Sequence, residues 1–150
     1  MKYLSTIMVA AMAGAFAVSA IGPTSFAQDA ASAVKARIDL MKSNGAANGK
    51  IAKSDNAKDI AAEAKTIQDN AKKLATLWPP NSITDNSRAK AEIWSNKADF
   101  DSKLKALDEN AGKVMAAAEK GDVAAAKEAH KGVAAQCGSC HQAYRGPEKK

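Results

Sequence analysis

The chain has 150 residues, a length that suits one domain, and its 22 Lys and Arg residues exceed its 16 Asp and Glu residues for a formal net charge of +6. Its lysines are scattered among acids, and only 5% of its residues are aromatic. A nucleic-acid-binding surface needs a concentrated basic patch, so this composition argues against one. It favours a solvated surface with some preference for acidic partners.

The N-terminal residues 1–27 have the pattern of a secretory signal peptide. Lys2 precedes an apolar run over residues 4–21, and small residues occupy the −3 and −1 positions of a cleavage site after Ala27. We therefore expect export to the periplasm and a mature domain at residues 28–150. A membrane anchor is the alternative, but the cleavage site disfavours it, and no second apolar segment is long enough to span a bilayer.

Two helices are predicted in the first half of the mature chain, because alanine is abundant, β-branched residues are sparse and no period-two alternation occurs. The first is expected over residues 29–48 and the second over residues 56–78, where the Pro-Pro pair that follows would end it. The face of the first helix consists of Val34, Ile38, Met41 and Gly45. The face of the second consists of Ile60, Ala64, Ile67, Ala71, Leu74 and Trp78.

Two more helices are predicted over residues 89–120 and 123–144. Gly121 is a suitable C-terminal stop for the first of them, and Asp122 is a suitable N-cap for the second. The predicted core face of the earlier helix is Phe100, Leu104, Leu107, Ala111, Val114 and Ala118. The inner face of the later one is Val123, Ala126, His130, Val133, Cys137 and His141. Four amphipathic helices with mostly short connections predict an all-α, antiparallel four-helix bundle.

The last predicted helix contains the sequence Cys-Gly-Ser-Cys-His at residues 137–141, a C-x-x-C-H pattern typical of c-type haem attachment. Cys137 and Cys140 lie on one helical face, so their thiols can form thioether bonds with the vinyl groups of one porphyrin. His141 follows directly and can bind the haem iron as its proximal axial ligand. We therefore expect the bundle to enclose one covalently bound haem c with its iron.

Other sites also use a C-x-x-C pair, namely redox dithiols, disulfides and zinc sites. The chain has 2 cysteines and 2 histidines in all, so a four-cysteine zinc site is excluded and a Cys2His2 site would have the wrong spacing. A thioredoxin-like motif expects a βαβ context, whereas this pair ends an alanine-rich helical stretch. A helical bundle whose cysteines form a disulfide remains as a further hypothesis.

Together these features resemble the class II cytochromes c, which include cytochrome c-prime and its low-spin relative cytochrome c-556. Beyond the haem motif, the resemblance rests on Arg37, Met41, Leu77-Trp78-Pro79-Pro80, Glu92-Ile93-Trp94, Phe100 and Tyr144-Arg145. It implies a periplasmic four-helix bundle, a monomer or a homodimer, that carries electrons between redox partner proteins of unknown identity. His130 departs from the family pattern, because an apolar residue such as Phe or Met is expected there.

The axial position opposite His141 separates two functional hypotheses. Cytochrome c-prime leaves this position empty, is five-coordinate and high-spin, and binds NO or CO. The c-556 subgroup fills it with a methionine from the first helix. Residues 37–45, Arg-Ile-Asp-Leu-Met-Lys-Ser-Asn-Gly, resemble the c-556 pattern and imply that Met41 is the distal axial ligand. Met115, the other methionine left after processing, reads as core packing, which is also the alternative for Met41.

Several other residues have two interpretations. Arg37 lies one turn before Met41 and could pair with a haem propionate or lie on the surface. Trp94 could contact the porphyrin or close the bundle. Arg145 is one turn beyond His141 and could lie near the exposed ring edge, but a solvated charge at the helix end is the favoured interpretation. His130 is interpreted as a partly buried or rim histidine without a chemical role. No nucleophile–base set or carboxylate pair indicates an enzyme.

Overall fold

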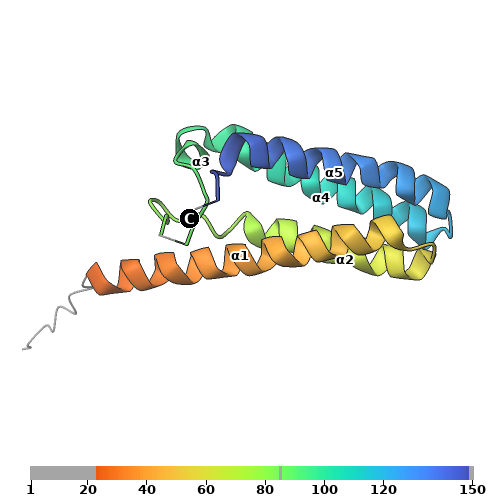
Figure 1. The fold of residues 1–150 in the computed structure, drawn as a ribbon, viewed down its shortest axis with the longest axis horizontal. Coiled ribbons are helices and arrows are strands. Elements are labelled where there is room, and N and C mark those ends of the chain that lie inside the picture. The colour runs from red at the N-terminus through yellow and green to blue at the C-terminus, as the bar shows by residue number, and fades with distance from the viewer. Residues whose placement is uncertain (1–22, 85, 149–150) are drawn as a thin grey trace, which may run out of the picture.

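The computed structural model describes residues 23–84 and 86–148, and its regular structure is helical. Four long helices form the bundle: α1 (Pro23–Lys53), α2 (Ala57–Leu74), α4 (Lys97–Glu119) and α5 (Val123–Tyr144). A single turn, α3 (Glu92–Ser95), precedes α4. Figure 1 shows α1 antiparallel to α2, and α4 antiparallel to α5. The described chain is therefore the all-α four-helix bundle predicted from the sequence.

The predicted signal peptide, residues 1–27, lies outside the described residues except for positions 23–27, which form the first turn of α1. Within the part of the chain that is described, no helix is both long enough and apolar enough to cross a membrane.

Helix α1 continues to Lys53, beyond its predicted end at residue 48, and Gly49 lies inside it. A glycine in a helix interior costs about 1 kcal/mol relative to alanine. The continuation is favourable because Ala47 and Ile51 extend the apolar face and are 1% and 0% exposed. Full burial of an isoleucine side chain contributes about 1.5–3 kcal/mol, which exceeds the cost of the glycine.

Helix α2 begins where the sequence predicts, because the Asn56 side chain caps it by accepting from the backbone N–H groups of Lys58 and Asp59. It ends at Leu74, earlier than predicted, so that Trp78 lies in the following loop. A residue before proline avoids the helical conformation, and Trp78 and Pro79 both precede a proline. In a continued helix the ring of Pro79 would also clash with the carbonyl of Ala75, four residues earlier, which accounts for the end at Leu74.

The region predicted as one helix over residues 89–120 is divided into α3 and α4. Residues 88–90 cannot begin a helix, because they are hydrogen-bonded to the end of α5. The backbone N–H of Lys90 donates to the Tyr144 carbonyl at 3.1 Å, and Ala89 forms an isolated antiparallel bridge with Arg145. All six residues of the predicted core face of this region are buried: Phe100, Leu104, Leu107, Ala111, Val114 and Ala118.

The core consists of two clusters. The larger one fills the middle and far end of the bundle around Ile60, Ile67 and Val114. The smaller one lies towards the end with the long loop, and is made of Leu74, Ile93, Phe100, Leu104 and Tyr144. Helix α2 packs extensively on α1 and α4, and α4 packs on α5, whereas α1 and α5 make few contacts with each other. The bundle is therefore open between α1 and α5.

Candidate functional site

A cavity of about 490 Å³ lies where α1 and α5 separate. Its volume falls in the range of about 300–1,000 Å³ that is usual for sites of small molecules and cofactors. An adjoining cavity of about 140 Å³ shares Met41, Gly45, Cys140 and His141 with it. The larger cavity has a mainly apolar wall that includes Val34, Ile38, Met41, Trp78, Ile93, Phe100 and Tyr144.

Helix α5 brings Cys137, Cys140 and His141 to this space. Cys140 and His141 line both cavities, Cys137 lines the smaller one, and all three are partly buried. The thiols are free rather than joined in a disulfide, and burial raises the pKa of both. Burial lowers the pKa of His141, and the charges of Arg145 and Arg88 lower it further. The imidazole is therefore neutral at pH 7 and has the lone pair that an iron ligand needs.

Helix α1 presents Met41 to the same space. Met41 is partly buried, lines both cavities and packs against the smaller core cluster. Met115 packs against the larger cluster instead and lines neither cavity. The structure thus brings Met41 and His141 to one cavity from two different helices, and keeps Met115 away from it.

Arg37 is buried with only 4% of its surface exposed, which rules out the surface alternative. Its Nη2 donates to the Ser82 carbonyl at 2.5 Å, and its guanidinium lies 4.1 Å from the centre of the Trp78 ring. Burial lowers the pKa of Arg37 to about 10, so it remains charged at neutral pH.

Two buried donors on this wall have no hydrogen-bond partner among the described residues, namely Arg37 Nη1 and Trp78 Nε1. Buried polar groups in proteins are nearly always hydrogen-bonded, and both of these residues line the larger cavity. An anionic group in the cavity would satisfy them.

The charges of the wall fit the same kind of ligand. The residues that line the larger cavity include four cations, Arg37, Lys42, Arg88 and Arg145, and no carboxylate. A haem has an apolar ring system with propionate groups on one edge. The mainly apolar wall suits the ring, and the cations suit the propionates, so the residues present fit this cofactor.

Trp94, predicted as a haem contact or a closing residue, is absent from the lining of both cavities. Its Nε1 donates to the carbonyls of Trp78 at 3.3 Å and Pro79 at 3.2 Å, and its ring meets the Trp78 ring edge-on. It therefore supports the loop that carries Trp78. Trp78 itself was not predicted as a site residue, and the signal that could have identified it is the Trp-Pro-Pro sequence that places it beyond α2.

His130 is more buried than expected, at 9% exposed, and its Nε2 lies 2.7 Å from Asn48 Oδ1 on α1. It joins α5 to α1 on the side of the smaller cavity that Asn48 lines. Among residues 23–84 and 86–148, no group of three or more His, Cys, Asp or Glu side chains is arranged to hold a metal ion.

A family model, similar sequences and similar solved structures all indicate the same protein family. A protein-family model described as Cytochrome C' matches residues 11–145. Cytochrome c-556 from Agrobacterium tumefaciens (strain II Chrys) is 38% identical over 120 residues, which are 75% of this chain and 95% of that protein. Cytochrome c' from Alcaligenes xylosoxydans xylosoxydans is 38% identical over 88 residues, 55% of this chain and 69% of that protein.

Among solved structures, the nitric oxide complex of a mutant cytochrome c prime from Alcaligenes xylosoxidans superimposes with a TM-score of 0.71 at 28% identity. The match covers 79% of this chain and 97% of that one. The fold, the apolar cavity beside the C-x-x-C-H sequence and these similarities agree. The chain belongs to the cytochrome c' family and is a c-type cytochrome, an electron carrier with covalent haem c and its iron.

Proposed function

We propose that this protein carries electrons in the periplasm with a six-coordinate, low-spin haem whose axial ligands are His141 and Met41. The observation that carries this proposal is that α5 presents His141, and α1 presents Met41, to one cavity. The proposal includes a mature chain of residues 28–150, formed by cleavage after Ala27. It also includes the expectation that the protein is a carrier and not an enzyme.

The haem supplies an iron centre that alternates between the ferrous and ferric states, and the protein's residues set its access and potential. Cys137 and Cys140 would attach it through thioethers, which fixes its edge against α5. Trp78, Phe100 and Ile93 would exclude water from the ring. A thioether ligand at Met41 favours ferrous iron and raises the reduction potential relative to an empty position.

Arg37 and Trp78 are proposed to bind a propionate with their free donors. Ferrous haem carries one more negative charge than ferric haem, so a buried cation stabilises the ferrous form more. Arg37→Gln is expected to lower the reduction potential by the equivalent of about 1–2 kcal/mol, for charges on the order of 10 Å apart in a medium of effective dielectric constant near 20. Spectroelectrochemical titration measures this shift.

The matched control is Lys53→Gln, which removes an exposed cation at the C-terminal end of the same helix. Its potential is expected to stay within experimental error of the wild type, because solvent screens an exposed charge at that distance. Equal shifts in both variants would contradict the proposed role of Arg37.

A second candidate function is gas binding by a five-coordinate, high-spin haem. It is favoured by the solved relative that is a nitric oxide complex and by the cavity of about 140 Å³ beside Met41. The two functions differ in whether Met41 occupies the iron.

Carbon monoxide binding tests this difference. Slow or negligible binding to the native ferrous protein is expected, because Met41 must first leave the iron and the surrounding helices resist that movement. Stopped-flow mixing followed by the change in absorption of the haem measures the rate. Fast, tight binding, as at an open site, would favour the gas-binding function instead.

A further inference from the structure

Helix α1 carries a second buried donor without a partner, about one turn beyond Met41. Asn44 is 6% exposed, and its Nδ2 has no hydrogen-bond partner among the described residues. Asn44 lines the smaller cavity together with Met41. Buried side-chain nitrogens are nearly always hydrogen-bonded, so this one indicates an acceptor that belongs in the cavity.

A contact with α2 fixes the direction in which the Asn44 amide faces. The Nδ2 of Asn70 donates to Asn44 Oδ1 at 2.9 Å and to Ser43 Oγ at 3.0 Å. Asn70 is itself only 6% exposed, so water does not compete for these bonds. Because the oxygen of the Asn44 amide is held by α2, the amide cannot rotate without breaking that bond. The free nitrogen is therefore oriented before any acceptor enters the cavity.

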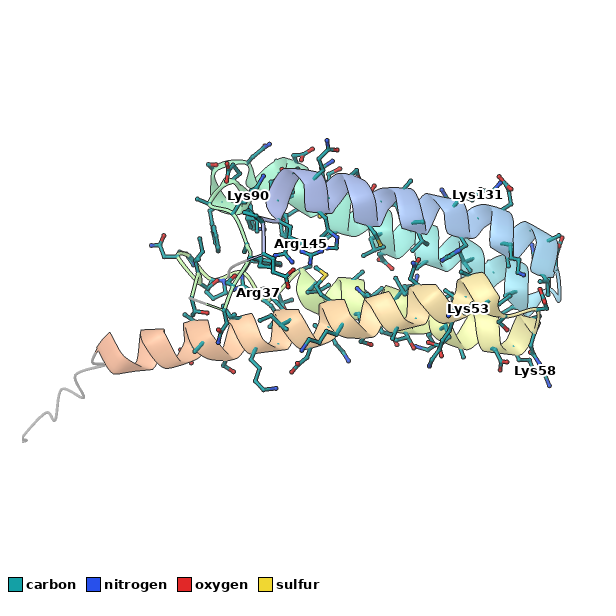
Figure 2. The ribbon with its side chains drawn as sticks, viewed as in Figure 1. Arg37, Lys53, Lys58, Lys90, Lys131 and Arg145 are labelled. Carbon is teal, nitrogen blue, oxygen red and sulfur yellow. The ribbon has the colours of Figure 1, made fainter. Side chains whose placement is uncertain are left out.

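The position of Asn44 separates its donor from those proposed to bind a propionate. Figure 2 shows Arg37 at one end of the bundle and Lys53 at the other, and Asn44 lies between them on α1. Arg37 and Trp78 line the larger cavity, whereas Asn44 lines the smaller one. Arg37 and Asn44 are about two helical turns apart, which is about 10 Å along the axis. One carboxylate held by Arg37 therefore leaves Asn44 unsatisfied.

The other amide and cationic side chains that line the smaller cavity have partners elsewhere. Asn48 Oδ1 lies 2.7 Å from His130 Nε2, and Gln136 Nε2 donates to the Lys103 carbonyl at 3.1 Å. The Lys103 ammonium lies 3.9 Å from the Asp99 carboxylate. The rest of the lining is two leucines, one glycine, the two cysteines, Met41 and His141. Since haem attachment uses the cysteines and the iron uses His141, the Met41 sulfur is the acceptor that remains.

We propose that Asn44 is a positioning residue for the distal iron ligand, and that its Nδ2 donates to the sulfur of Met41 and raises the reduction potential. The inference rests on the proposed function, because it requires Met41 to bind the iron. A thioether sulfur is a weak acceptor and keeps a second lone pair when the first binds a metal. Side chains three positions apart on a helix are neighbours, and the Asn44 side chain leans back towards the turn that carries Met41.

The hydrogen bond raises the potential through two effects of the same sign. It withdraws electron density from the sulfur, which then stabilises ferric iron less. It also points the positive end of an N–H dipole at the iron, and ferrous haem carries one more negative charge than ferric haem. A hydrogen bond of ordinary net strength changes an equilibrium constant about fivefold. Loss of the donor is therefore expected to shift the equilibrium about fivefold towards ferric haem, which is about 40 mV for one electron.

The test compares three variants of the haem-loaded protein by spectroelectrochemical titration. Asn44→Ala removes the donor, and Asn44→Leu removes it while keeping a side chain of similar size. Asn110→Ala is the matched control, because the Asn110 Nδ2 donates to the Gly132 carbonyl at 3.3 Å between α4 and α5 and lines neither cavity. Both Asn44 variants should show the fivefold shift towards ferric haem, and the control should change less than about twofold.

Nuclear magnetic resonance of the ferrous wild-type protein tests the contact itself. Low-spin ferrous haem is diamagnetic, and its ring current shifts the methyl protons of an axial methionine far upfield. An Nδ2 proton of Asn44, assigned by its loss in Asn44→Leu, should show a nuclear Overhauser effect to that methyl group. It should also exchange slowly with solvent, because the amide is buried.

The outcomes separate this inference from the proposed function. An upfield methionine methyl without the contact to Asn44, or an unchanged potential in both Asn44 variants, would overturn the inference and leave Met41 as the iron ligand. Contact of the Nδ2 protons with a bound water alone would overturn it as well. So would an equal shift in Asn110→Ala, since a general loss of packing would then explain the effect. Absence of any upfield methionine methyl, with a high-spin ferric spectrum, would refute the proposed function and the inference together.

Discussion

Met41→Ala is expected to convert a six-coordinate, low-spin haem into a high-spin or water-ligated one. The substitution removes the sulfur that the proposal places on the iron and leaves a space beside the cavities that Met41 lines. Loss of the partly buried side chain alone should cost about 2 kcal/mol of stability, the low end of the range for truncating a core methionine. The reduction potential should fall, and carbon monoxide should bind readily. Absorption spectra of the oxidised and reduced variant, with and without carbon monoxide, measure the change.

The matched control for this prediction is Met115→Ala. Met115 is partly buried against the larger core cluster and lines neither cavity. Its truncation should lower stability, because packing is lost, while the spectrum stays that of the wild type. If Met41→Ala lowers stability and leaves the spin state unchanged, Met41 is a core residue and not an iron ligand.

Replacing both Cys137 and Cys140 by alanine is expected to abolish covalent attachment of the haem. No thiol would remain, since the chain has 2 cysteines in all. Acid–acetone extraction should leave the colour with the wild-type protein and remove it from the variant. Mass spectrometry of the polypeptide should show the added mass of a haem only in the wild type.

Ser139→Ala provides the control, because Ser139 lies between the two cysteines, is exposed and donates only to the Gln136 carbonyl of the same helix. It should retain covalent haem. Pigment that leaves the wild-type protein with the solvent, in a host able to mature c-type cytochromes, would refute attachment through these thiols.

The regular part of the fold could be predicted from the sequence because its signals are local. The spacing of Phe100, Leu107 and Val114 on one helical face corresponds to burial in the structure, and Asp122 begins α5 by accepting from Ala125 N–H. Helix periodicity and caps depend on residues within one or two turns of each other. Helix periodicity and helix caps can therefore be predicted from the sequence alone.

The interrupted parts of the fold depend on contacts between distant residues. The bridge between Ala89 and Arg145 prevents residues 88–90 from joining a helix, and nothing near residue 89 indicates it. Burial of Ile51 likewise keeps α1 helical through Gly49. Local propensity is a weak influence that tertiary packing overrides at such places.

The site residues likewise fall into two groups, those that a local sequence pattern predicts and those that contacts with distant residues position. A contiguous sequence predicts the roles of Cys137, Cys140 and His141, because the attachment chemistry needs these residue types at that spacing. The environment of Arg37 could not be read from its neighbours, since the Ser82 carbonyl and the Trp78 ring reach it from beyond α2. The positions of the two tryptophans in the sequence also do not indicate that Trp78 lines the cavity. Nor do they indicate that Trp94 instead contacts Trp78 and the Pro79 carbonyl.

The electron paramagnetic resonance spectrum of the ferric wild-type protein at neutral pH tests the central claim most directly. Ligation by His141 and Met41 from opposite helices predicts a low-spin ferric signal with no substantial high-spin component. A predominantly high-spin signal would show that Met41 does not bind the iron, and would contradict the preference for low-spin electron transfer over gas binding.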